Sequence, residues 1–279
     1  MLFPVKVVRE QFPNLDATNQ GRMVAEVGAK FSENAIRDFA IDKVGLTKQH
    51  TYIFKLGRTF DRNSFVKENL PFTVLSDSRQ DVSYAFAGLA TLTYNILMTN
   101  PTEEAVILCY QPVRVVVRQR ILVIQTTIME RKPSSYMAVD KDRRVFETSK
   151  TNEEEELIPS ILAAFKIQCT VESCDINRGV KALWETDVID CTSISYKKDK
   201  STATEAMDEQ YTLKSHLPEI YRDATSRPLR QTIFKPLRND EKFSRHFRVD
   251  PTKGELSMRI YPEHPDQTWN VINEILANN

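Results

Sequence analysis

Glycine is scarce in this sequence, with 7 residues among 279. Globular chains usually contain about 7% glycine. Loops that cradle phosphates need clustered glycines, because only glycine lets the backbone approach a phosphate closely. Even the nearest pair, Gly21 and Gly28, is too far apart along the chain to form such a loop. The sequence therefore argues against the glycine-rich mononucleotide and dinucleotide sites.

Long apolar runs and an excess of charge of either sign are also missing. No uncharged apolar run reaches the roughly 20 residues of a membrane-spanning helix, and residues 1–12 lack the apolar core of a signal peptide. Lysine plus arginine equal aspartate plus glutamate at 38 each, so the net charge is +0. These features predict no membrane partner and a cytoplasmic, intracellular protein, with the nucleus as the alternative. Any nucleic-acid role must depend on a local basic patch.

Metal-binding and catalytic motifs are not apparent. Of the 4 cysteines, Cys169 and Cys174 lie close in sequence, but no histidine accompanies them, and a structural zinc site needs four clustered ligands. Without a secretion signal, the thiols are expected to be reduced. The sequence contains neither a GxSxG elbow nor an HExxH pair. We therefore expect no metal, no cofactor, and a non-enzymatic role in preference to catalysis.

The stretch 105–129, AVILCYQPVRVVVRQRILVIQTTIM, is the most β-branched part of the chain. Such residues favour strands, and its arginines rule out a membrane span. Because proline cannot donate to a ladder, we expect two strands that bend at Gln111-Pro112. Shorter patterns predict strands at 3–12, 51–56, 182–196 and 255–261.

Apolar residues recur at helical spacing elsewhere in the chain. They predict helices near 22–41, 78–98, 153–167 and 266–276, the second of them capped by Ser76, Asp77 or Ser78. Strands and helices do not alternate regularly, which favours an α+β (mixed α/β) fold. Its central, mostly antiparallel sheet is expected to be built on 105–129 and packed by the first three helices.

Composition changes in the last third of the chain. Residues 197–210 hold few apolar side chains, which is typical of a mobile loop or linker. We therefore divide the chain into a core domain at 1–196, this linker, and a C-terminal extension at 211–279.

Two groups of basic residues are candidate binding sites. The first is Arg114, Arg118 and Arg120, which would share one face of a regular strand and could hold phosphates or acidic groups. A solvated sheet face, or pairing with carboxylates of a neighbouring strand, explains the same pattern.

The second group interleaves cations with aromatic rings between residues 221 and 253. Such a mixture is typical of single-stranded nucleic-acid binding, of an arm that docks on another subunit, or of a surface segment whose rings pack beneath it. Its candidate binding residues are Arg227, Arg230, Phe234, Lys235, Arg238, Phe243, Arg245, Phe247 and Arg248.

Two functional hypotheses remain. The first is a non-enzymatic assembly or binding protein, such as a viral structural or RNA-associated protein, that self-associates through its C-terminal arm. Its partners would be further copies of the chain and single-stranded RNA or another nucleic acid. The alternative is an enzyme with a dispersed site, such as a metal-dependent nuclease that uses Asp187 and Asp190 near Lys197 and Lys198.

Overall fold

A computed structural model describes residues 3–15, 20–80, 83–129, 145–151, 154–198, 200–208, 210–237, 243 and 246–279. Over these ranges, the helices are α1 (Val5–Gln11), α2 (Gln20–Lys30), α3 (Glu33–Asp42), α4 (Glu154–Lys166), α5 (Asn177–Glu185), α6 (Leu213–His216), α7 (Pro218–Thr225) and α8 (Gln267–Ala277). Two short 3-10 helices are η1 (Val44–Leu46) and η2 (Lys67–Asn69). The strands are β1 (Gln49–Leu56), β2 (Thr73–Gln80), β3 (Ser83–Met98), β4 (Glu103–Arg118), β5 (Ile121–Thr127), β6 (Val145–Thr151), β7 (Val171–Ser173), β8 (Ile189–Lys197), β9 (Thr202–Ala206), β10 (Leu229–Pro236), β11 (Phe247–Asp250) and β12 (Glu255–Met258).

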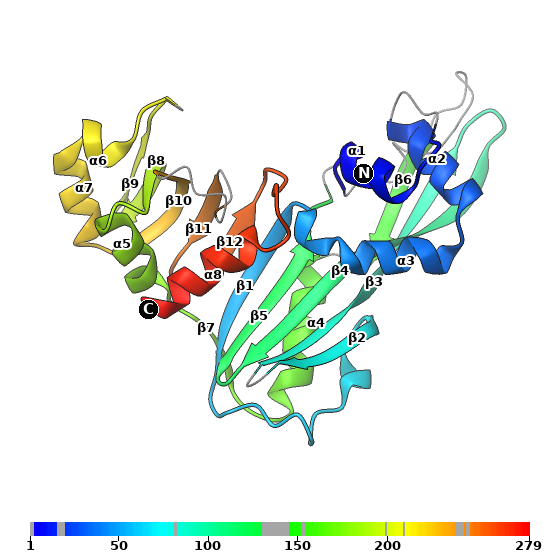
Figure 1. The fold of residues 1–279 in the computed structure, drawn as a ribbon, viewed down its shortest axis with the longest axis horizontal. Helices are drawn as coiled ribbons and strands as arrows, with labels where there is room; N and C mark the ends of the chain where they lie inside the picture. Colours follow the sequence, from blue (N-terminus) through cyan, green and yellow to red (C-terminus); the bar gives the residue numbers. More distant parts are fainter. Residues whose placement is uncertain are drawn as a thin grey trace.

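One antiparallel sheet joins the described strands in the order β2-β3-β4-β5-β1-β12-β11-β10-β8-β9. Two further strands lie off this path, since β6 pairs with β3 and β7 pairs with β1. The N-terminal strand β1 therefore pairs with the C-terminal strand β12, which ties the two ends of the chain into the same sheet (Figure 1). The predicted α+β class and the antiparallel sheet around 105–129 are confirmed.

Strand β4 shows how the two faces of the sheet are divided. Val113, Val115 and Val117 are fully buried in one apolar cluster with α4. Arg114, Val116 and Arg118 alternate with them and point to the opposite face, because successive side chains of a strand project to opposite sides. Helix α8 lies over that second face, in front of the sheet, and α4 lies behind it (Figure 1).

A second apolar cluster fills the C-terminal half of the molecule. It joins α5 and α8 to β8, β10, β11 and β12, and its largest buried side chain is Trp184. Helix α8 therefore packs against two parts of the molecule. Its apolar side covers this cluster, and another side of it lies over β4.

The predicted helix at 78–98 is wrong, because residues 78–80 belong to β2 and residues 83–98 form β3. The β3 residues Phe86, Ala90, Leu92, Tyr94 and Ile96 are buried at even spacing, which is a strand period. Strand β3 pairs with β4 along its full length, from Ser83↔Arg118 to Met98↔Glu103. Pairing with a strongly β-branched neighbour outweighs the local helical spacing.

Other predicted elements differ in type or extent. Residues 3–12 were expected to form a strand but hold α1, and 182–196 holds the end of α5 before β8 begins. The helix expected at 22–41 is two helices, because Ser32 ends one and caps the next by accepting a hydrogen bond from the main-chain N of Ala35 at 3.3 Å.

The bend predicted at Gln111-Pro112 is also wrong. Strand β4 continues through both residues, and the chain reverses at Gln119, which has a φ of 54°. Pairing of β4 with β5 starts only at Val113. Pro112 therefore sits just outside the β4–β5 ladder, where its missing amide leaves that ladder intact.

The remaining predicted elements are close to those observed. The strands at 51–56 and 255–261 and the helices at 153–167 and 266–276 correspond to β1, β12, α4 and α8. The predicted linker 197–210 contains β9, which pairs with β8. The division into domains stays a prediction.

Candidate functional site

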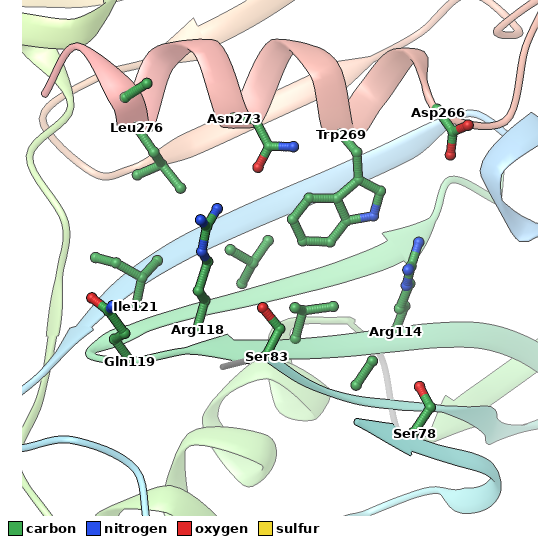
Figure 2. Close-up of a pocket in the computed structure, with 14 residues that line it drawn as sticks. Ser78, Ser83, Arg114, Arg118, Gln119, Ile121, Asp266, Trp269, Asn273 and Leu276 are labelled. Carbon is green, nitrogen blue, oxygen red and sulfur yellow. The ribbon is translucent and has the colours of Figure 1, made fainter. Parts of the chain in front are cut away.

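A cleft of about 570 Å³ lies between α8 and the face of the sheet that carries Arg114 (Figure 2). Strands β2 to β5 form its floor, and α8 forms its roof. Its polar lining residues are Ser78, Ser83, Arg114, Arg118, Gln119, Asp266, Trp269 and Asn273. Its apolar lining residues are Ala85, Val116, Ile121, Val123, Leu276 and Ala277.

Regular secondary structure explains why these side chains meet. Arg114 and Arg118 are four residues apart on β4, so both point up towards α8 (Figure 2). On the helix, Trp269, Asn273 and Leu276 are spaced at four and three, so they share the face that looks down on the sheet. The cleft therefore has two cations on one wall and an indole ring on the other.

Arg114 and Trp269 contact each other across the cleft. The guanidinium carbon of Arg114 lies 5.1 Å from the centroid of the Trp269 ring, a cation–π distance. Burial lowers the pKa of Arg114 from its ordinary value, while the negative charge of Asp266 opposes that shift. The ordinary pKa of arginine is so high that the group stays charged at neutral pH.

Two groups in the cleft have unused hydrogen-bonding capacity. Arg118 is exposed, and no hydrogen bond or ion pair joins its guanidinium to the residues that the structure describes. The indole Nε1 of Trp269 is buried and has no acceptor among the described residues. The exposed Arg118 guanidinium can donate to a bound ligand through two nitrogens at once. The indole Nε1 is covered, so the part of Trp269 that a ligand can contact is its ring.

The chemistry of the cleft suits binding better than catalysis. Asp266 is the one carboxylate among the described lining residues, and its charge acts on Arg114. Two guanidiniums attract an anion such as a phosphate, and an indole offers a flat apolar surface to a planar ring. Serine hydroxyls and the Asn273 amide add neutral hydrogen-bonding groups at the rim.

Of the first basic group predicted from the sequence, the structure brings together Arg114 and Arg118 only. Arg120 lies in the turn after β4, where its guanidinium donates to the carbonyls of Leu56 at 3.1 Å and Gly57 at 2.9 Å. The expected common face for all three arginines is therefore wrong for Arg120, because β4 ends at Arg118.

None of the described residues of the second group lines the cleft, and most of those that the structure describes belong to β10 and β11. Phe234 and Phe247 belong to β10 and β11, and their rings are buried in the C-terminal core. Phe243 packs against the same cluster. In this conformation the buried rings of Phe234 and Phe247 have no access to a base or a partner.

Several cations of this second group have intramolecular partners. Arg227 pairs with Asp223 at 2.8 Å, and Arg230 donates to the Thr252 hydroxyl at 2.9 Å. Arg248 donates to the side chain of Gln231, and Lys235 lies on β10 with Phe234. Arg238 and Arg245 lie outside the described residues. A binding role for this group stays a prediction.

The aspartates of the alternative hypothesis also have structural roles. Asp190 is 2% exposed and accepts hydrogen bonds from Trp184 Nε1 and from its own neighbour Cys191 N, both at 2.7 Å. Asp187 pairs with Lys214 at 2.7 Å. Nowhere in the described ranges do three or more histidine, cysteine or acidic side chains cluster as metal ligands would.

Sequence reasoning missed every polar residue of the site except the two arginines, and among these Trp269, Asn273 and Asp266 come from the C-terminal part of the chain. Trp269 lies within the helix predicted at 266–276, where it is one of the apolar residues at helical spacing, and nothing in its local pattern indicates a contact with Arg114. The one signal available was the pair of arginines four residues apart in a strand.

Among the described residues, no helix has the length and apolar character needed to cross a membrane. Comparisons with protein-family models, curated proteins and solved structures gave no match for the chain.

Proposed function

We propose that this protein is a non-enzymatic binding protein for single-stranded nucleic acid, with RNA as the first candidate, and that the α8 cleft is its binding site. The observation that carries the proposal is the placement of Arg114 and Arg118 opposite Trp269 in one cleft. A nucleotide combines a phosphate with a planar base, and this cleft pairs cations with an aromatic ring.

The local charges fit a modest, salt-dependent interaction. The whole chain has a net charge of +0, so long-range attraction of a polyanion is weak. Binding must come from contacts inside the cleft, where guanidiniums meet phosphates and a base packs on the open part of the indole. Ser83 and Asn273 line the same cleft and can hydrogen-bond a ribose hydroxyl, which distinguishes RNA from DNA.

The size of the cleft limits how much of a strand it can hold. Pockets of about 300–1,000 Å³ accommodate ligands of drug size, so a cleft of about 570 Å³ suits one or two nucleotides. A longer strand would have to leave the cleft at either end. All four cysteines are free thiols, which supports an intracellular setting for this function.

We expect the Trp269→Ala variant to bind a labelled RNA 12-mer about tenfold to a hundredfold more weakly, because a stacked base contributes ~1–3 kcal/mol. The Arg118→Ala variant should bind more weakly and lower the slope of log K against log salt by about 0.7, the value for one phosphate contact on a single strand. Fluorescence anisotropy at several salt concentrations measures both quantities.

Two matched variants control for general effects. Trp269→Phe keeps an aromatic face and should retain most of the affinity. Arg178→Ala removes the same charge from an exposed position on α5 and should leave both the affinity and the salt slope unchanged. If wild-type protein does not bind RNA at low salt, or if Arg178→Ala lowers the affinity as much as Arg118→Ala, the proposed site is wrong.

A further inference from the structure

A hollow of about 500 Å³, the β2 hollow, lies beside the α8 cleft. Ser78 lines both cavities, and it lies at the edge of the α8 cleft away from α8 (Figure 2). Residues 75–79 of β2 are all exposed, so a ligand can pass from one cavity to the other over this strand. The other residues that line the β2 hollow are Arg62, Asn63, Asp77, Arg79 and Tyr84.

The β2 hollow contains a guanidinium stacked on a ring. The guanidinium carbon of Arg79 lies 5.5 Å from the centroid of the Tyr84 ring, a cation–π distance. Tyr84 is only partly exposed, and its ring also contacts Phe60 at a centroid distance of 5.6 Å. Arg79 itself is exposed. The ring therefore supports the guanidinium from the side of the protein, and a base can stack on the guanidinium as it does on an aromatic ring.

The carboxylate of the β2 hollow is already paired with cations. Arg62 and Lys67 contact Asp77 at 2.5 Å and 3.4 Å. The guanidinium carbon of Arg62 also lies 5.3 Å from the centroid of the Phe86 ring. These contacts hold the segment before β2 against the strand, and they offset the negative charge that would otherwise repel a phosphate from Arg79.

We propose that the β2 hollow is a second binding site for the RNA strand that enters the α8 cleft, with a base stacked on Arg79. This inference rests on the proposed function. The register of the sheet puts Arg79 opposite Tyr84, and Arg118 opposite Ser83, the neighbour of Tyr84. Two strand spacings, roughly 10 Å in all, therefore separate the main chains that carry the two arginines. A few nucleotides of a single strand span such a distance.

Two linked sites bind a long strand more tightly than either site alone, because binding at the first raises the effective concentration at the second. A dinucleotide, which the α8 cleft alone can hold, gains nothing from the β2 hollow. The length of the RNA therefore separates the contribution of the second site from that of the first.

The test compares a labelled dinucleotide with the labelled RNA 12-mer in anisotropy titrations of the full chain. We expect Arg79→Ala to weaken binding of the 12-mer at least about fivefold, because it removes the group on which a base stacks, and to leave binding of the dinucleotide unchanged. Trp269→Ala should weaken binding of both. Arg79→Lys keeps the charge without the planar group, so it should bind the 12-mer more weakly with the salt slope of the wild type.

Arg178→Ala, on α5, is the charge control and should change neither titration. If Arg79→Ala weakens binding of the 12-mer no more than Arg178→Ala does, the β2 hollow is not a binding site, and the α8 cleft keeps its proposed role where Trp269→Ala still weakens binding. An equal loss for the dinucleotide and the 12-mer in Arg79→Ala also overturns the second site, because Arg79 would then act on the cleft. A wild-type protein that binds neither RNA overturns the proposed function and this inference together.

Discussion

The Asp190→Ala variant is expected to lose about 3 kcal/mol of unfolding free energy, because it removes the buried acceptor of several hydrogen bonds. Asp190 is 2% exposed, and it accepts from Trp184 Nε1 and Cys191 N at 2.7 Å and from Lys214 N at 3.3 Å. Alanine would leave these donors buried without an acceptor. Urea unfolding, followed by tryptophan fluorescence to which the fully buried Trp184 contributes, measures the loss.

Asp187→Asn is the matched control for Asp190→Ala. Asp187 has a φ of 57°, which asparagine tolerates and alanine does not. Its side chain is 63% exposed and forms one ion pair with Lys214, and exposed ion pairs contribute less than about 1 kcal/mol. We therefore expect a loss of at most ~0.5 kcal/mol.

The same two variants separate a structural role of the aspartates from a catalytic one. If both aspartates are structural, neither variant changes any cleavage of RNA, with or without Mg²⁺. A well-folded Asp190→Ala protein of wild-type stability that has lost a Mg²⁺-dependent cleavage would contradict the structural role and restore the nuclease hypothesis.

Local sequence was sufficient to predict the strands at the centre of the sheet but not all of the strands that pair with them. The β-branched residues of β4 and β5 allow little besides strand, and their pairing is observed. Residues 83–98 contain alanine, leucine and methionine at helical spacing as well as the alternation of a strand, so the period alone was ambiguous. What decides the structure is the long partner β4, which a local pattern does not contain.

For the same reason, only the wall of the cleft that β4 provides could be predicted from the sequence. Arg114 and Arg118 share a strand, so their common face follows from an even spacing. Trp269 meets Arg114 only because β1 and β12 pair and bring the C-terminal helix back over β4. A contact between residues this far apart in the chain depends on sheet order, which spacing does not encode.

The basic-aromatic segment shows a limit of a different kind. Its alternation of cations and rings suits nucleic-acid binding, a docking arm or a surface segment whose rings pack beneath it, and a strand with one buried face produces the same pattern. Phe234 is buried on β10, while Ile233 beside it is 37% exposed. A single sequence does not distinguish rings that face a core from rings that face a ligand.

Gly179→Ala should destabilise the protein by about 2 kcal/mol, within the usual cost of overpacking, and should also weaken RNA binding. A Cβ at Gly179, on α5, would lie 2.0 Å from the main-chain O of Ile275, on α8. Main-chain atoms cannot move aside as the end of a flexible side chain can, so α8 as a whole must shift. This shift would displace Trp269 and Asn273, which α8 contributes to the cleft. Urea unfolding and the anisotropy titration measure the two effects.

Gly28→Ala, on α2, makes the same chemical change without the close contact, since a Cβ there meets nothing within 4 Å. It should stabilise the protein by about 0.5–1 kcal/mol, the difference between alanine and glycine in a helix, and leave RNA binding unchanged. If the packing of α8 on α5 sets the width of the cleft, Gly179→Ala must lower both the stability of the protein and its affinity for RNA. A Gly179→Ala protein that is less stable yet binds RNA with wild-type affinity would show that the position of α8 does not control the site.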